Sequence, residues 1–298
     1  MSMKKILKLL YKKQTLILTG IIMLVAASFI GLSFHAGIKD VLNRMMSANA
    51  VWLLLIVGAQ SIAYWAYVVP YKHVFKIGYK EAVLHSFEGF HPMLPGGGFR
   101  YDIAAHCSLG EKARAYYLSL WEYAALAPVI MVAAIYAVVH GGVPYPLSLP
   151  WVIGVPAGSG LFALGVIFRD RISRFPKAHR ILDFMLNMLR QQDKKEIGIL
   201  MAGMVMYWAG EIFALWGALQ LFQVHLDWFA LLIAYATGYV ISRRSMPLGG
   251  AGIVLIMLAF SLHWVGAALS VALLAALAYQ VSNLLMPALY RRAAISSP

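Results

Sequence analysis

Long apolar runs separated by short polar segments dominate this chain. A helix needs roughly 20 residues to cross about 30 Å of hydrocarbon, and most of the runs reach that length. The pattern therefore predicts an all-α polytopic membrane protein with about eight transmembrane helices. The expected spans are residues 14–34, 48–69, 116–139, 148–168, 197–222, 227–241, 249–262 and 264–289.

The sixth and seventh runs, 227–241 and 249–262, are shorter than the others. Two interpretations are open for them. They can be tilted spans, or they can be broken helices that share the interruption at residues 242–252.

Charge is scarce and unevenly placed along the chain. Only 12% of the residues are charged and 61% are hydrophobic, with a mean hydropathy of +0.73. All but two of the 25 Lys and Arg fall in segments on the side of the N-terminus, the exceptions being Lys39 and Arg44. This asymmetry predicts that both termini face the cytoplasm of a bacterial-type inner membrane. The net charge of +13 then indicates attraction to anionic lipid headgroups, and we expect no nucleic-acid partner.

A basic segment, residues 169–196, separates the approximate halves 1–168 and 197–298 of what we expect to be a single membrane domain. Its apolar residues recur every three or four positions, which predicts an amphipathic helix. Such a helix can lie at the membrane interface or can simply link the two halves.

The segment HPMLPGGGFRYD, residues 91–102, breaks the apolar pattern with prolines and glycines. The flanking arms, 81–93 and 99–109, are too short to cross a membrane. They predict either a re-entrant hairpin or a cytoplasmic cap. A second break, SRRSMPLGGAGI at 242–253, occurs in the other half, and paired breaks of this kind indicate a transporter site at the membrane midplane. The expected cavity-lining backbone is Pro95, Gly96, Gly97, Gly98, Pro247, Gly249, Gly250 and Gly252.

Ionisable residues within membrane segments are the strongest candidates for function, because a buried charge costs about 2.5–3.5 kcal/mol even on insertion scales. Glu211 lies near mid-depth of its span, where it either serves function or is a protonated acid bonded across a helix interface. Glu122 can form an ion pair with Arg100 or Arg114, or contact substrate. The predicted substrate-binding residues are Arg100, Asp102, Glu122, Glu211, Arg243 and Arg244.

The arginines beside the two breaks suit a phosphate group, since guanidinium groups and free backbone N–H groups both bind phosphate. Arg243 and Arg244 can also be ordinary cytoplasmic anchors. We assign no metal, cofactor or catalytic residue. The chain has one cysteine, no His-x-x-x-His spacing and no phosphate-binding P-loop.

Two motifs, MLPGGGFRYD and MPLGGAGI, resemble those of a known family: the lysylphosphatidylglycerol synthase transmembrane region, which is also the flippase part of the MprF proteins and of the YbhN-like proteins. Glu122 matches an acidic position of that family. The chain departs from the family pattern in two ways. Val254 and Leu255 stand where a glutamate is common, and Gln280 stands where an arginine is common.

The resemblance implies about eight helices in two subdomains with re-entrant, Pro/Gly-broken elements, and an activity on lipids with charged headgroups. The family's soluble transferase domain is absent from this sequence. We therefore expect a lipid translocase, flippase- or scramblase-like, that acts without ATP hydrolysis on a phospholipid or polyprenyl-linked lipid. The alternatives are a membrane-embedded lipid-modifying enzyme, and a non-catalytic partner of a lipid-synthesis enzyme. A homo-oligomer is compatible with each.

Overall fold

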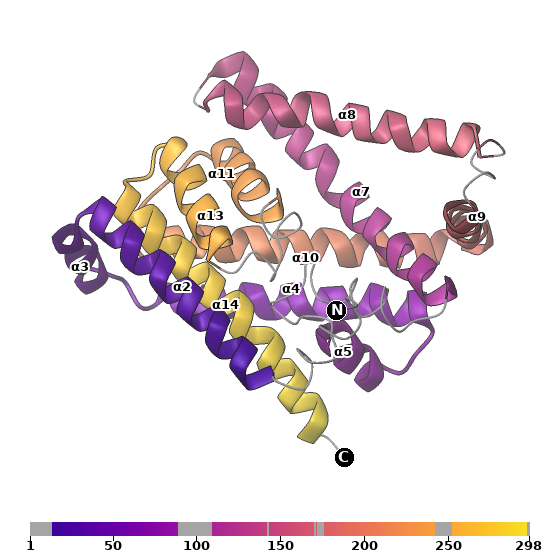
Figure 1. Cartoon of the computed structure of the whole chain (residues 1–298), viewed down its shortest axis with the longest axis horizontal. Helices are drawn as coiled ribbons and strands as arrows, with labels where there is room; N and C mark the ends of the chain where they lie inside the picture. Colours follow the sequence, from indigo (N-terminus) through magenta and orange to yellow (C-terminus); the bar gives the residue numbers. More distant parts are fainter. Residues whose placement is uncertain are drawn as a thin grey trace, which may run out of the picture.

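The computed structural model describes residues 14–88, 109–141, 143–169, 171, 176–241 and 252–296. Within these ranges every regular element is a helix (Figure 1). In chain order the elements are α2 (Gln14–Ala36), α3 (Ile38–Met46), α4 (Trp52–Phe75), α5 (Tyr79–Glu88), α7 (Leu109–His140), α8 (Tyr145–Ile167), α9 (Pro176–Gln191), α10 (Lys194–Gln220), α11 (Trp228–Tyr235), the π-helix η2 (Ala236–Ile241), α13 (Ile253–Trp264) and α14 (Leu269–Ser296).

Among the described residues, five helices are long and apolar enough to cross a membrane, namely Trp52–Phe75, Ala113–His140, Tyr145–Ile167, Lys194–Gln220 and Leu269–Ala294. The count rises to six if Met23–Ala36 and Ile38–Met46, which meet at a bend of 105°, form one span. The chain is thus an integral membrane protein whose described part is all-helical, as the apolar runs predict. The predicted number of eight spans stays a prediction, because the helices in the sixth and seventh runs are short.

The centre of the fold is the antiparallel pair α4 and α10, the most extensive helix pair among the described elements. Three glycines spaced seven residues apart, Gly203, Gly210 and Gly217, face α4 along this interface. A Cβ added at Gly210 would lie 2.7 Å from the backbone oxygen of Ala59, and one at Gly203 would lie 2.4 Å from Pro70 Cγ. Small residues at a helix interface let two membrane helices approach closely. The glycine row therefore fixes how near α4 lies to α10.

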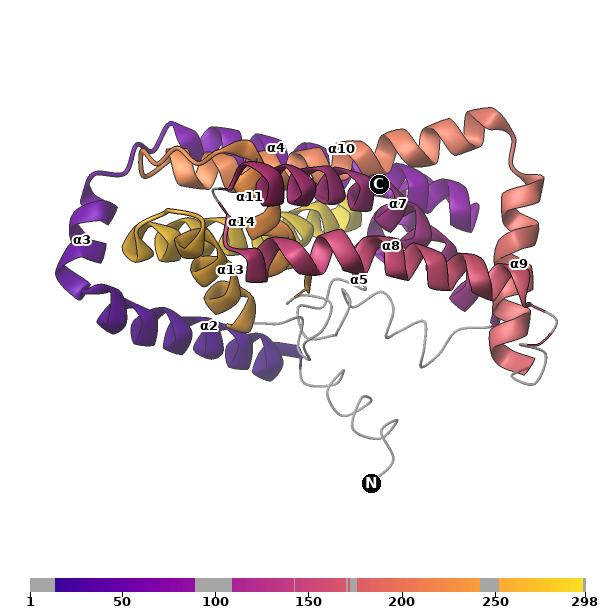
Figure 2. The same ribbon diagram turned by 90° about the horizontal axis from the view of Figure 1, so that it is seen from above.

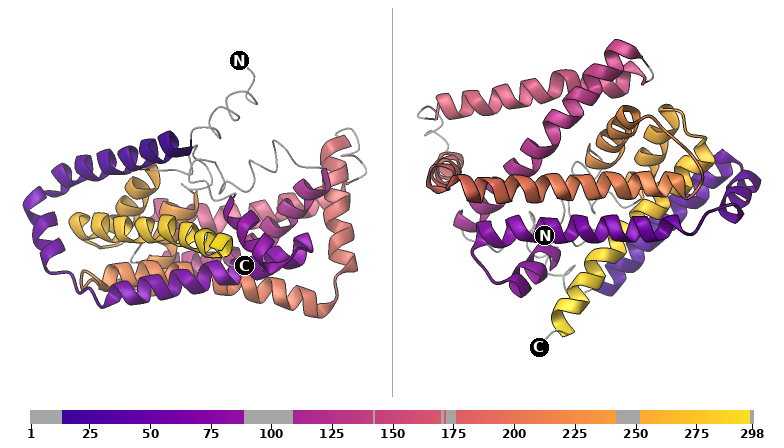
Figure 3. Two further views of the ribbon diagram at one scale, coloured as in Figure 1. Left: turned by 90° about the horizontal axis from the view of Figure 1, so that it is seen from below. Right: turned by 180° about the vertical axis from the view of Figure 1, so that it is seen from behind.

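Helix α14 crosses the α4–α10 pair and completes the core, as the right panel of Figure 3 shows. The arrangement is held at one end by a backbone hydrogen bond from Asn49 N to Leu221 O, at 2.8 Å. Helix α7 packs on α10 from the other side, where the Trp208 indole donates to the backbone oxygen of Glu122 at 2.8 Å. Each helix of the core thus contacts α10.

The two ends of the bundle carry different charges. Helix α3 lies at one end and α9 at the opposite end, with α4 and α10 running between them (Figure 2). Lys39 and Arg44 lie on α3, whose Asp40 accepts a hydrogen bond from Ser270 at the start of α14. The opposite end gathers Lys72, Lys76, Lys80, Arg114, Arg169, Arg171, Arg180, Arg190, Lys194 and Lys195. The positive-inside pattern of the sequence is therefore also a separation in space.

Helix α9 forms within the predicted basic amphipathic segment. Its apolar residues Ile181, Met188 and Leu189 pack on the core and Met185 is buried, while Arg180 and Arg190 are exposed. The helix contacts α7, and the Tyr117 hydroxyl on α7 bonds Gln192 in the turn that follows α9. The interfacial and the linking interpretation of this segment are both compatible with that packing.

Helices α11 and α13 are the described parts of the two short apolar runs. The first residue of α11 and the last residue of α13 both lie near the end of the bundle that carries α3. This follows because α11 begins shortly after α10 ends there, and α13 ends shortly before α14 begins there. They pack on each other, and Gly238 of η2 lies so close to α13 that an added Cβ would be 2.6 Å from Leu258 Cα. At 1.5 Å per residue, the 12-residue α13 is about 18 Å long, well short of a full span. This geometry favours the broken-helix interpretation over two tilted spans.

Candidate functional site

Glu211 lies in the interior of the bundle, with none of its surface exposed. It stands nine residues before the end of α10 at Gln220, which places it about 14 Å from that end at 1.5 Å per residue. The other end of α10, at Lys194, is about 25 Å away by the same rise. The carboxyl group is thus deep in the span, as the sequence predicts.

Three side chains donate hydrogen bonds to the same oxygen, Glu211 Oε2. Asn283 Nδ2 of α14 lies 2.9 Å away and Gln60 Nε2 of α4 lies 3.4 Å away. The third donor is the hydroxyl of Tyr279, also on α14. Polar side chains from two neighbouring helices therefore meet a carboxyl group of a third, inside a core that is otherwise mostly apolar. We call Glu211, Gln60, Tyr64, Tyr279 and Asn283 the Glu211 cluster.

Local sequence explains why these side chains meet. Tyr279 and Asn283 are four residues apart on α14, so they lie on one face of the helix. Gly210, directly before Glu211, allows α4 to approach at Ala59, which directly precedes Gln60. The close contact of the two backbones places Gln60 within reach of Glu211.

Asn283 also ties the cluster together. The Tyr64 hydroxyl donates to the side-chain oxygen of Asn283 and lies 3.0 Å from its backbone oxygen. Asn283 therefore accepts from α4 and donates to α10, so that α4, α10 and α14 share one hydrogen-bond network. Networks of this kind fix the relative position of buried helices because each unsatisfied group would carry a desolvation cost.

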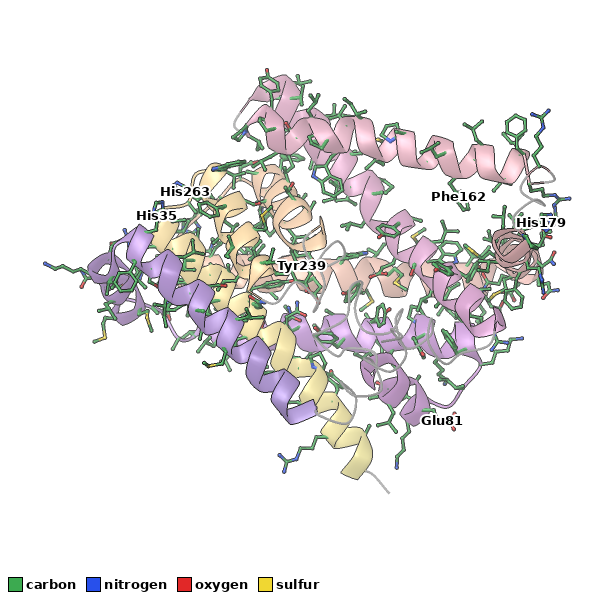
Figure 4. All side chains as sticks on the ribbon, in the orientation of Figure 1. His35, Glu81, Phe162, His179, Tyr239 and His263 are labelled. Atoms are coloured by element: carbon green, nitrogen blue, oxygen red, sulfur yellow. The ribbon has the colours of Figure 1, made fainter. Side chains whose placement is uncertain are left out.

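Aromatic rings continue from the cluster toward η2. Tyr279 meets Tyr239 edge-on with ring centroids 5.0 Å apart and meets Tyr235 at 6.2 Å. Tyr235 stacks on Tyr239 at 5.2 Å, and Tyr239 is labelled near the middle of the molecule in Figure 4. Tyr239 lies three residues before residue 242, where the second Pro/Gly break begins. The tyrosines thus connect the Glu211 cluster with η2.

Two buried amide oxygens in this region have no hydrogen-bond partner among the described residues. They are Gln60 Oε1, on a side chain with no exposed surface, and Gln280 Oε1, on a residue that is 6% exposed. A buried polar atom without a partner costs about 1–3 kcal/mol. Gln60 Oε1 belongs to the amide that also donates to Glu211, so the cluster has one acceptor without a partner among the described residues.

The second predicted carboxylate, Glu122, is 7% exposed and lies on α7. The indole N–H of Trp208 donates a hydrogen bond to the backbone oxygen of Glu122. Trp208 lies on α10, three residues before Glu211. Arg114 is one of the two expected partners of Glu122. In the structure, its guanidinium group donates a hydrogen bond to the backbone oxygen of Phe75, at 3.4 Å. The two candidate acids therefore lie on neighbouring helices.

One residue of the predicted glycine breaks is described. Gly252 precedes α13 with a positive φ of 71°, and an added Cβ would lie 2.7 Å from Ser28 Oγ of α2. Both the backbone angle and the close approach favour glycine here. Outside the described residues lie the other predicted positions, namely Pro95, Gly96, Gly97, Gly98, Arg100, Asp102, Arg243, Arg244, Pro247, Gly249 and Gly250.

Sequence reasoning singled out Glu211 but not the residues around it. Gln60, Tyr64, Tyr279 and Asn283 are uncharged residues within long apolar runs, and nothing in the runs separates them from other polar positions. The seven-residue spacing of Gly203, Gly210 and Gly217 was the available signal, since it marks the face of α10 on which a partner helix packs.

Comparison with protein-family models gives no match for this chain, and comparison with curated proteins gives none either. The resemblance to the lysylphosphatidylglycerol synthase transmembrane region stays a prediction from the two motifs.

Proposed function

We propose that this protein is a lipid translocase, flippase- or scramblase-like, that moves a lipid with a charged headgroup across the membrane without hydrolysing ATP. The observation that carries the proposal is Glu211, a fully buried carboxyl group deep in a span, held by side chains from two other helices. Ionisable residues in such positions usually mark the path of a substrate or an ion.

The short apolar helices add support. Secondary transporters commonly bind substrate and coupling ion where discontinuous helices end near the bilayer midplane. Here α11 with η2, and α13, are each too short to span, and Tyr239 at the end of one of them contacts Tyr279 of the Glu211 cluster. The short helix η2 therefore packs beside the cluster that holds the buried acid, which supports the proposal.

The finer features of the proposal come from the sequence. We propose eight membrane segments with both termini on the cytoplasmic side of a bacterial-type inner membrane, and membership of the MprF-like flippase family. Arg100, Asp102, Arg243 and Arg244 are the proposed contacts for the phosphate and the polar headgroup. A guanidinium pair suits phosphate, and carboxylates suit an amino group, so a zwitterionic or cationic lipid is the proposed substrate class.

The test is a leaflet-exchange assay. Purified protein is reconstituted in liposomes that contain fluorescently labelled lipids with anionic, zwitterionic or cationic headgroups, and the fraction of label that external dithionite bleaches is followed over time. The proposal predicts that bleaching exceeds the outer-leaflet fraction for at least one headgroup. Bleaching equal to that of protein-free liposomes for every headgroup would contradict it.

Variants test the proposed phosphate contacts in the same assay. The double variant Arg243→Ala/Arg244→Ala should slow translocation, because both guanidinium groups are lost. Lys72→Ala is the matched control, since Lys72 is an exposed basic residue at the end of α4. Equal rates for the two variants would remove the arginine pair from the proposed site.

A further inference from the structure

Helix α9 lies across the basic end of the bundle. It is seen nearly end-on in Figure 1, where α10 runs across the view, and from the side at the same end of the molecule in Figure 2. Only Gln192 and Asp193 separate α9 from the start of α10. Since α10 is long and apolar enough to cross a membrane, α9 lies along the membrane surface at the level where α10 enters.

The corner between α9 and α10 is held in place by hydrogen bonds. The Tyr117 hydroxyl of α7 bonds the Gln192 side chain, and the Asp193 carboxylate caps α10 by accepting from the backbone N–H of Glu196, at 2.7 Å. Lys194 and Lys195 follow directly and are exposed. Lysines at the end of a membrane helix extend toward the lipid headgroups. The corner therefore fixes α9 at headgroup level.

The apolar side of α9 is wider than its contact with the protein. Leu182, Phe184 and Leu186 are partly exposed and lie outside the core packing of the described residues. At 3.6 residues per turn, Leu182 and Leu186 lie at one border of the apolar side and Phe184 lies at the other. Both borders thus extend past the protein contact. That contact is made by Ile181, Met185, Met188 and Leu189.

Basic side chains flank the apolar borders of α9. Arg180 and Arg190 are both exposed, and each lies on the polar side next to one border. The helix contains three Lys and Arg but only one acid, Asp183, whose carboxylate lies 2.9 Å from His179 Nδ1 on the same helix. An apolar face bordered by arginines is typical of helices that lie in the interface of membranes with anionic lipids. Guanidinium groups also match the geometry of phosphate.

We propose that α9 is an interfacial helix that binds anionic phospholipids of the leaflet at the basic end of the bundle. Leu182 and Leu186 contact the acyl chains next to the headgroups, while Arg180 and Arg190 bind the headgroup phosphates. The occupant is lipid because the apolar borders lie at the level of the membrane surface and the charge of the helix is opposite to that of the headgroups. The proposal concerns binding alone, so it holds whether or not the protein translocates lipid.

Fluorescent labels on adjacent residues test the placement of α9. In a Cys107→Ser background, Leu186→Cys and Asn187→Cys are labelled with bimane, and the full chain is reconstituted in vesicles that contain phosphatidylglycerol. With iodide on both sides of the membrane, the label at 186 should be blue-shifted and shielded, and the label at 187, an exposed position of the polar side, should be quenched. Leu182→Cys, one turn earlier, should behave like 186. Equal iodide quenching at 182, 186 and 187 would overturn the proposal.

Brominated lipids test the partner. At equal mole fraction, brominated phosphatidylglycerol should quench the label at 186 at least about twofold more than brominated phosphatidylcholine, because the anionic lipid gathers at the arginines. Arg180→Gln/Arg190→Gln should abolish this preference. The matched control Lys39→Gln/Arg44→Gln, which removes two exposed basic groups from α3 at the other end of the bundle, should retain it. Equal quenching by both lipids without these substitutions, or a preference that survives loss of Arg180 and Arg190, would overturn the proposal.

Discussion

Asn283 Nδ2 lies 2.9 Å from Glu211 Oε2, across the contact between α14 and α10. The same asparagine accepts a hydrogen bond from Tyr64 of α4. One side chain therefore joins three membrane helices around a buried acid. The network makes the position of the acid depend on the packing of all three helices.

Replacing Asn283 with Ala should destabilise the fold, because it removes the bridge and leaves Tyr64 and Glu211 each short of one partner. Loss of a partner for buried polar groups costs about 1–3 kcal/mol per group. Unfolding by denaturant in detergent micelles measures the loss. The control is Ser282→Ala, since the Ser282 hydroxyl bonds only the backbone of its own helix, at Tyr279 O. Equal losses for both variants would contradict the bridging role.

Gly210→Val should push α4 away from α10, since a Cβ at this position meets the Ala59 backbone oxygen at 2.7 Å. Overpacking of a tight contact typically costs about 1–3 kcal/mol. Gly198→Val is the matched control on the same helix, because an added Cβ there has no described atom within 4 Å. Thermal melting in detergent should separate the two variants. A Gly198 variant as unstable as the Gly210 variant would point to helix propensity instead of packing.

Thr237 of η2 accepts a hydrogen bond from the Trp151 indole on α8, at 3.0 Å. Replacing it with Val keeps the shape and removes the acceptor, which should lower stability by about 0.5–1.5 kcal/mol. Thr237→Ser keeps the hydroxyl and should retain most of that stability. Chemical unfolding of both variants tests the contact. A loss in the serine variant as large as in the valine variant would assign the effect to the methyl group.

The two ends of the bundle should face opposite sides of the membrane. In a Cys107→Ser background, Met46→Cys on α3 and Gln191→Cys on α9 place single thiols at exposed positions of opposite ends. A membrane-impermeant maleimide added to intact cells should label position 46 directly and position 191 only after permeabilisation. Labelling of both positions from the same side would contradict the predicted orientation.

Periodicity and length were enough to locate the long helices, because a membrane span needs a fixed number of apolar residues in succession. The runs at 48–69, 116–139, 148–168 and 197–222 each lie within or nearly within a described helix. The run at 264–289 begins earlier than α14 does, because Val265 and Gly266 form a turn. Boundaries depend on such local turns, which apolar composition does not mark.

The partners of Glu211 were beyond reach from the sequence for a different reason. Gln60 and Asn283 lie 151 and 72 residues away along the chain, and only the packing of α4 and α14 on α10 brings them to the carboxyl group. An isolated polar residue in an apolar run can face a partner helix, a cavity or a backbone carbonyl. Three-dimensional packing decides among these outcomes.

The most direct test of the account is the rate of lipid translocation by Glu211→Gln in proteoliposomes, compared with the wild type and with Phe213→Leu. Phe213 lies two residues along α10 and is 46% exposed, so its variant controls for the reconstitution. We predict that Glu211→Gln keeps the wild-type melting temperature and loses at least about tenfold in rate, equivalent to ~1.4 kcal/mol in the barrier, while Phe213→Leu stays near the wild type. A Glu211→Gln protein that is folded and as fast as the wild type would contradict the assignment of function to this buried acid.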